Sequence, residues 1–114
     1  MSVLHIAHAA DWQRARVAGQ YRWSSRGSTL DENGFIHCAT VEQVDGVAHR
    51  FYNDDAEPLV VLVIDEEAIA TSGIELKFED GGDGELFPHV YGAILPEWVT
   101  EARPAAFVDD AFSY

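Results

Sequence analysis

The sequence predicts an α+β fold with a mixed, split β-sheet of about five to seven strands and two main helices. Short apolar stretches with strand periodicity recur along the whole chain, and two segments with helical spacing fall among them without regular alternation. Apolar residues make up 47% of the sequence, which is enough to form a core. With 114 residues, the chain is predicted to form a single domain over residues 1–114.

The first quarter of the chain predicts a strand, a helix and a loop. Residues 2–8, SVLHIAH, alternate as a strand does. Residues 9–19, AADWQRARVAG, predict a short helix that ends at Gly19. Residues 20–33 are polar and rich in turn-forming residues, so we expect a surface loop, and loops of this length are often functional.

The stretch NGFIHCAT, residues 33–40, predicts a strand entered from a tight turn. A helix follows, because TVEQ matches a capping box in which Thr40 and Gln43 satisfy each other's free backbone amides. Apolar residues at helical spacing mark the buried face of this helix: Val44, Val47, Ala48 and Phe51.

The second half of the chain contains four predicted strands. Residues 58–65, PLVVLVID, are apolar on both faces, so this strand should be central. Residues 74–80, IELKFED, alternate as a half-buried strand does, and the GGDG turn at residues 81–84 leads to LFPHVYGAIL at residues 86–95. Residues 99–107, VTEARPAAF, are expected to form the last strand.

The charge balance excludes one class of partner. Seven lysines and arginines against 20 acidic residues give a formal net charge of -13. Nucleic-acid affinity depends largely on cationic side chains that displace phosphate counterions, so we expect no nucleic-acid partner. A small anionic or nucleotide-like molecule remains compatible with this charge, because one or two arginines are enough to hold a phosphate.

The sequence also predicts a cytoplasmic protein without a membrane partner. The longest apolar run, residues 59–64, has the length of a strand and is too short to span a bilayer. The N-terminus shows no basic segment followed by an apolar block and a cleavage site. The single cysteine cannot form an internal disulfide. The oligomeric state is left open.

Three histidines, His5, His37 and His89, lie within predicted strands among apolar neighbours. Burying several imidazoles costs solvation free energy unless each finds a partner, which makes a shared site attractive. If the three strands adjoin, their inward faces form a polar centre with aromatic walls that include Phe87 and Tyr91. We therefore take the three histidines as candidate catalytic residues, and purely structural histidines as the alternative.

The predicted loop before His37 carries further candidates for ligand binding. Trp23 and Arg26 are suited to close over a stacked ring and an anionic group. The alternative interpretation is a loop folded back on the core, with Trp23 as its anchor. Cys38 follows His37 directly and so faces the other side of the strand, where a buried packing role is expected.

A metal centre is a further interpretation of the histidines, because three imidazoles with an open fourth position resemble a catalytic zinc site. The sequence contains no close ligand pair of the HExxH or CxxC kind. His5 and His8, the closest pair in the strand segments, point to opposite faces of a strand. We therefore predict no metal ligand among the candidate residues.

The stretches GFIHCAT, LVVLVID and LFPHVYG resemble a family of small bacterial proteins classed as a domain of unknown function, across nearly the whole chain. The layout is more remotely similar to the ADP-ribosyltransferase superfamily, which includes RNA 2'-phosphotransferases. This similarity implies an ADP-ribosyltransferase-like split sheet that clamps NAD or an ADP-ribosyl group. NAD or ADP-ribose is thus the implied substrate.

The superfamily resemblance also implies roles for single residues. His5 matches the polar residue of its first motif and His37 the histidine form of its second, where both would hydrogen-bond ribose hydroxyls or phosphate. His89 falls at or near the place where the third motif usually holds a glutamate, and it would serve there as general acid or base. Tyr91 or Trp23 would stack on the ring.

Three functional hypotheses follow from the residues and the resemblance together. The first is a divergent ADP-ribosyltransferase-like enzyme with a three-histidine pocket for a small nucleotide-like ligand. The second is a binding or interaction module that keeps the pocket without catalysis. The third is a metal-dependent enzyme that uses the histidines as ligands.

Overall fold

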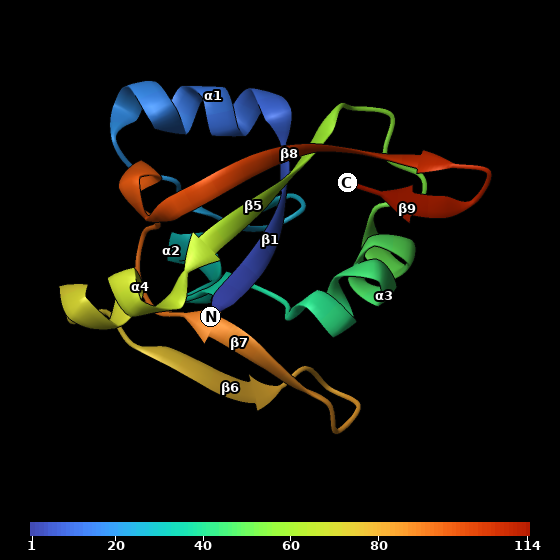
Figure 1. Ribbon diagram of the computed structural model, residues 1–114. Helices are drawn as coiled ribbons and strands as arrows, with labels where there is room; N and C mark the ends of the chain where they lie inside the picture. The colour runs from blue at the N-terminus through green and yellow to red at the C-terminus, as the bar shows by residue number, and fades with distance from the viewer.

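The computed structural model describes residues 1–114 and confirms a mixed architecture of helices and antiparallel sheets (Figure 1). It contains four α-helices and one 3-10 turn among nine strands. The elements follow the chain in this order: β1 (Ser2–His8), α1 (Ala9–Ala18), β2 (Trp23–Ser25), β3 (Ser28–Thr29), α2 (Leu30–Asn33), β4 (Ile36–His37), α3 (Val41–Phe51), β5 (Leu59–Asp65), α4 (Glu66–Ser72), β6 (Leu76–Asp80), β7 (Leu86–Val90), η1 (Pro96–Trp98), β8 (Val99–Val108) and β9 (Ala111–Ser113).

The strands form two larger sheets and one small hairpin. The four-stranded sheet has the order β1-β5-β8-β9, so the apolar strand β5 is central, as its sequence predicts. The three-stranded sheet has the order β4-β7-β6, and β2 pairs with β3. An antiparallel bridge between Leu4 and Ala39 joins β1 to the segment after β4, so the two larger sheets are in contact at this point.

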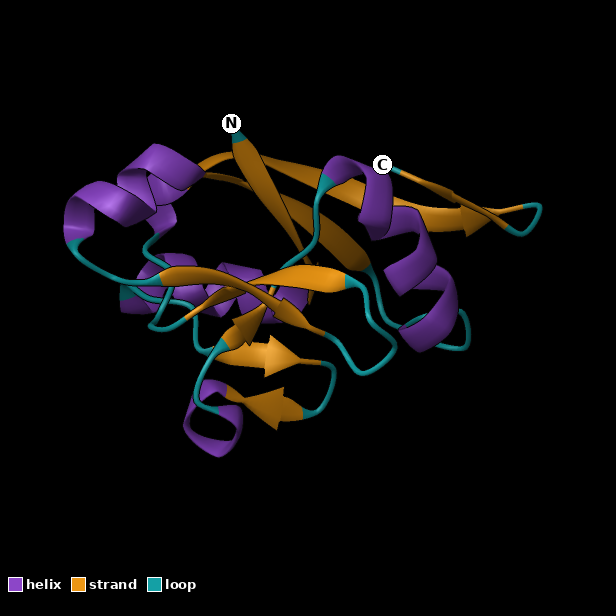
Figure 2. Cartoon of the chain, turned by 90° about the horizontal axis from the view of Figure 1, so that it is seen from below, coloured by secondary structure: helices purple, strands orange, loops and turns teal.

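Both faces of the central strands are buried, and they divide between two cores. Val60, Leu62 and Ile64 of β5 belong to a core that includes Trp12 of α1. Val61 of β5 lies on the opposite face, in a second core with residues of α3 and β1. Figure 2 shows the helices placed on different sides of the strands, which is the arrangement that this alternation requires.

Several helix boundaries are set by the capping residues that the sequence contains. The Gln43 side chain accepts a hydrogen bond from the Thr40 backbone N–H at 3.1 Å, as the capping box at the start of α3 predicts. Gly19 has a φ of 90° and donates to the Ala15 carbonyl, which ends α1 as expected. None of the helices combines the length and the apolar character needed to cross a membrane.

Residues 20–33 were expected to form a loop, and this expectation is wrong. They form the hairpin β2–β3 and the short helix α2. The cause is a second capping box, in which the Glu32 carboxylate accepts from the Thr29 N–H at 2.9 Å and the Glu32 N–H donates to the Thr29 hydroxyl. Gly27, with a φ of 77°, supplies the turn of the hairpin.

Other boundaries also differ from the prediction. The strand expected over residues 33–40 is only Ile36–His37, because Gly34 in a left-handed conformation ends α2 directly before it. The strand expected over residues 86–95 ends at Val90. Helix α4 was not predicted, although Asp65 caps it by accepting from the Glu67 N–H. These short elements bring the strands to nine, more than expected.

Candidate functional site

A cavity of about 530 Å³ lies between β1, β4, the start of β7 and helix α3. Its volume falls in the range of small-molecule sites, roughly 300–1,000 Å³. The structure brings His5, His37 and His89 to the wall of this one cavity, although they come from three different strands. The bridge between β1 and Ala39 and the direct pairing of His37 with His89 across β4 and β7 account for this convergence.

His5 is bonded at both of its ring nitrogens. Its Nδ1–H donates to the His37 carbonyl at 2.6 Å, and its Nε2 accepts from the Tyr21 hydroxyl at 2.9 Å. Because a carbonyl can only accept, Nδ1 carries the proton in this arrangement. Burial lowers the pKa of His5 to about 4, so the ring is neutral near pH 7. His5 therefore ties β1 to the backbone of β4 and to Tyr21, and it has no remaining nitrogen to offer a ligand.

His89 is bonded at only one ring nitrogen. Its Nδ1 lies 2.9 Å from Oε1 of Glu79, while its Nε2 is buried and makes no hydrogen bond within the protein. Only 4% of the residue is exposed. An unbonded buried polar atom is uncommon in folded proteins and is frequently found where a ligand binds or a reaction occurs. Nε2 of His89 is therefore the atom of this cavity that most clearly lacks a partner.

Glu79 is shared between His89 of β7 and Tyr91, which follows this strand. Its Oε1 accepts hydrogen bonds from the Tyr91 hydroxyl at 2.5 Å and from Nδ1–H of His89 at 2.9 Å. These two hydrogen bonds hold the pKa of the Glu79 carboxyl below its usual value, the Tyr91 bond having the larger effect. An ionised carboxylate can only accept, so Nδ1 of His89 carries a proton, and in the neutral ring Nε2 carries the lone pair.

His37 and Phe35 surround the His89 ring. Phe35 stacks on it with ring centroids 4.1 Å apart and planes 19° from parallel, and His37 meets it edge-on at 5.1 Å. Desolvation, and to a lesser degree the nearby His89, lower the pKa of His37. Unlike the other two histidines, His37 is exposed to solvent. It is therefore the member of the three that solvent reaches most easily.

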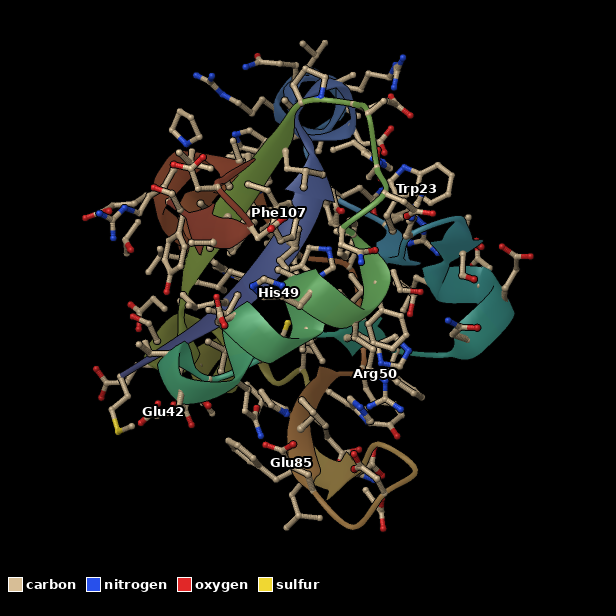
Figure 3. All side chains as sticks on the ribbon, turned by 90° about the vertical axis from the view of Figure 1, so that its right-hand side faces the viewer. Trp23, Glu42, His49, Arg50, Glu85 and Phe107 are labelled. Carbon is tan, nitrogen blue, oxygen red and sulfur yellow. The ribbon has the colours of Figure 1, made fainter.

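Two arginines contribute to the cavity wall in this strongly acidic chain. Arg26, beyond β2, forms ion pairs with Asp54 at 2.6 Å and with Asp55 at 3.1 Å. Arg50 of α3 lies 3.5 Å from Asp83, and Figure 3 shows it on the side of α3 that faces the β6–β7 loop. Two of only seven cationic side chains thus line one cavity, and each of them is paired with at least one aspartate.

The same hairpin is also tied to the first turn of α3. Nε2 of Gln43 donates to the Glu85 carboxylate at 3.1 Å and to the Leu86 carbonyl at 2.7 Å. Both Gln43 and Glu85 line the cavity, and Glu85 lies below α3 in Figure 3. The capping residue of α3 therefore also fixes the distance between this helix and the β6–β7 hairpin.

The predicted ligand-binding residues divide into two groups. Arg26 and Phe87 line the cavity, and the Phe87 ring packs over Gly81. Trp23 and Tyr91 do not line it. Trp23 is partly buried against the core, as the alternative interpretation proposed, and Tyr91 bonds to Glu79.

Sequence reasoning missed three residues that matter to this cavity. Phe51 was assigned to the buried face of α3, which is wrong: it is 53% exposed and lines the cavity. Arg50 drew no attention because its partner Asp83 lies far away in the sequence. Glu79 could have been found from the GGDG turn, because a hairpin closed there pairs Lys77 with His89 and puts Glu79 diagonally across from that histidine.

Two other arrangements suggest different chemistry. The ligand atoms of His8, Asp55 and Glu57 lie within 4.8 Å of one another, and this is the only such group in the chain. The three cavity histidines do not form a group of this kind.

Cys38 is buried in the core, and burial raises the pKa of its thiol to about 12, which disfavours a nucleophilic thiolate.

Comparisons with known proteins give a family and a set of related structures. Residues 6–102 match the family model described as protein of unknown function (DUF952). The crystal structure of protein CC0527 from Caulobacter crescentus is similar, with a TM-score of 0.81 and 27% identity over 97% of this chain and 91% of that one. The solution NMR structure of CC0527 gives a TM-score of 0.77 and 28% identity over 97% and 90%. No curated protein gives a significant match.

Proposed function

The chain belongs to the DUF952 family, and we propose that its cavity binds a small nucleotide-like molecule of the NAD or ADP-ribose type. We further propose that it acts on this molecule as a divergent ADP-ribosyltransferase-like enzyme. The observation that carries the proposal is Nε2 of His89, a buried and unbonded ring nitrogen in a cavity of about 530 Å³. A nitrogen in this state is suited to accept a hydrogen bond or a proton from a ligand.

The chemistry of the walls supports an anionic ligand with a flat ring. Arg26 and Arg50 supply positive charge for phosphate groups, and their guanidinium groups are suited to bidentate contacts. Phe51 and Phe87 line the same cavity and offer aromatic faces on which a base can stack. A nucleotide combines both properties, whereas a simple sugar or an apolar molecule uses only one.

The three histidines take different roles in this proposal. His89 is the general acid or base, because its Nε2 is the nitrogen left for a ligand. His37, which is exposed beside it, hydrogen-bonds the ligand. His5 acts indirectly by holding the His37 backbone through its carbonyl.

The binding test is a titration of ¹⁵N-labelled protein with ADP-ribose, followed by NMR. We expect the amide signals of His37, Phe87 and His89 to move, because these residues line the cavity. The control variant is His49→Ala, which removes a half-exposed histidine of α3 that does not line the cavity and should leave the titration unchanged. Signals that stay in place at millimolar ADP-ribose would refute the proposed ligand.

A second candidate is a binding module without catalysis. It is favoured by one observation: the only carboxylate in the cavity wall, that of Glu85, is already bonded to Gln43. Without a carboxylate directed at the ligand, an oxocarbenium-like centre would lack its usual stabilising anion. Incubation with NAD and chromatography of the products separates the candidates, since binding without nicotinamide release identifies the module.

A further inference from the structure

We infer that Glu79 and Tyr91 are positioning residues that make Nε2 of His89 a general base toward a hydroxyl group in the cavity. This inference rests on the proposed function, because it names how that site would act. It assigns Tyr91 a place behind the reacting nitrogen rather than against the ring of a ligand. It also names Glu79, whose carboxylate lies outside the cavity wall.

The first support is the geometry of the hairpin. Glu79 lies on β6, where its direct partner is Phe87; His89 of β7 and Tyr91, directly after this strand, follow at alternate positions. All three side chains therefore project from one face of the hairpin. Tyr91 is fixed by its own backbone, whose N–H donates to the Glu75 carbonyl at 2.9 Å. The hydrogen-bonded strands thus set the position of the carboxylate relative to the imidazole.

The second support is the pair of hydrogen bonds that the Glu79 carboxylate accepts. Oε1 of Glu79 accepts from the Tyr91 hydroxyl at 2.5 Å and from Nδ1–H of His89 at 2.9 Å. The Tyr91 bond keeps the carboxylate in place, and the carboxylate then determines which nitrogen of His89 carries the proton. Phe35 stacks on the ring at 4.1 Å and fixes its plane.

In this arrangement Nε2 of His89 can take a proton from a hydroxyl group in the cavity. The hydroxyl of a bound molecule, either water or an alcohol, gives its proton to Nε2 as its oxygen forms a bond to the ribose C1′ of bound NAD. The C1′–N bond to nicotinamide breaks at the same time, and neutral nicotinamide leaves with the electron pair of that bond. The imidazolium keeps its proton on Nδ1, and the ionised carboxylate of Glu79 stabilises the positive charge. Lys77, which pairs with His89 in register, has its ammonium over the Tyr91 ring and 3.8 Å from Glu75.

Long-range ¹⁵N–¹H NMR of the histidine rings tests this assignment directly, because it reports which nitrogen carries the proton. In the wild-type protein at neutral pH we expect His89 as the Nδ1–H form. In Glu79→Ala we expect a mixture of both tautomers, and a loss of turnover of about tenfold to a hundredfold. Glu79→Gln keeps an acceptor oxygen, so it should retain the tautomer and restore part of the turnover.

Two further variants complete the test. Tyr91→Phe removes one bond to the carboxylate and should change turnover by less than Glu79→Ala does. Glu75→Ala is the matched control, since Glu75 lies on the same hairpin and its carboxylate pairs only with Lys77. It should change neither tautomer nor turnover.

The outcomes separate this inference from the proposed function. A His89 ring that carries its proton on Nε2 in the wild type, or a tautomer unchanged in Glu79→Ala, would overturn the inference even if ADP-ribose binds. A tautomer that follows Glu79 while ADP-ribose leaves the NMR signals unmoved would uphold the positioning role and reject the proposed ligand. A turnover that is unaffected in Glu79→Ala would overturn the role of His89 as the base.

Discussion

Two buried histidines, His5 in the four-stranded sheet and His89 in the three-stranded sheet, show how similar sequence settings give different chemistry. Both lie in strands among apolar neighbours, and they are 3% and 4% exposed. His5 has a partner at each ring nitrogen, whereas His89 has a partner only at Nδ1. The first ring connects elements of the fold, and the second has one buried nitrogen without a partner in the protein.

The difference comes from what lies across from each strand. Across from His5, the His37 carbonyl and the Tyr21 hydroxyl complete its hydrogen bonds within the protein. Across from His89, β6 supplies Glu79 as a partner for Nδ1, and no group of the protein bonds to Nε2 of this cavity-lining residue. The number of bonded nitrogens therefore distinguishes these two histidines, whereas their burial does not.

The largest expected effect is the loss of stability in His5→Ala. The substitution leaves the His37 carbonyl and the Tyr21 hydroxyl without their partner and opens a cavity between β1 and β4. We expect the free energy of unfolding to fall by about 3–4 kcal/mol, measured by urea denaturation. A loss below about 1 kcal/mol would mean that His5 is not the connecting residue proposed here.

The second prediction concerns the pH dependence of stability. His5 has a pKa of about 4 in the folded protein and about 6.5 when unfolded, so only the unfolded chain binds this proton between these values. The contribution of His5 to the free energy of unfolding is complete above pH 6.5. It decreases by about 3 kcal/mol as the pH is lowered to 4. Urea denaturation between pH 7 and pH 4.5 checks this.

The control for the pH prediction is His5→Gln, which cannot titrate in this range. Its stability should depend less on pH than that of the wild type, since only the remaining groups titrate. Equal pH dependence in the two proteins would show that His5 does not carry the effect.

The third prediction contrasts His89 with His5. His89→Phe removes the unpartnered Nε2 together with the Nδ1 hydrogen bond to the half-exposed Glu79, and it keeps an aromatic ring against Phe35. We therefore expect the free energy of unfolding to change by only about 1 kcal/mol. NAD turnover should be lost, because the ring no longer accepts a proton. The measurements are urea denaturation and product chromatography. A stability loss as large as that of His5→Ala would remove the distinction between the two histidines.

Much of the framework could be predicted from the sequence because its signals are local. The capping box of Thr40 and Gln43, the left-handed Gly19 and the apolar strand at residues 59–64 all depend on neighbouring residues. The hairpin β2–β3 was missed because its short strands lack an apolar pattern, although Gly27 and the capping box of α2 were visible.

The site could be predicted only in part. The three histidines were found because they share a local setting, and the structure brings them to one cavity. Their different roles depend on partners that are remote in sequence, such as Tyr21 for His5, which is 16 residues away. The cavity position of Phe51 was missed for the same reason, since helical periodicity does not show which apolar side chain lies beside an open cavity.

The smallest effects are expected from two glycines that line the cavity. A Cβ at Gly81 would lie 2.6 Å from the Phe87 ring, so Gly81→Ala must displace this ring. We expect the free energy of unfolding to fall by about 1 kcal/mol and ADP-ribose binding to weaken. A Cβ at Gly46, inside α3, meets no atom within 4 Å, so Gly46→Ala should stabilise the protein by about 0.5–1 kcal/mol. Denaturation and calorimetric titration measure both variants. Opposite signs for their stability changes would show that the hairpin side of the cavity is packed against Phe87 while the α3 side is open, and equal signs would contradict this.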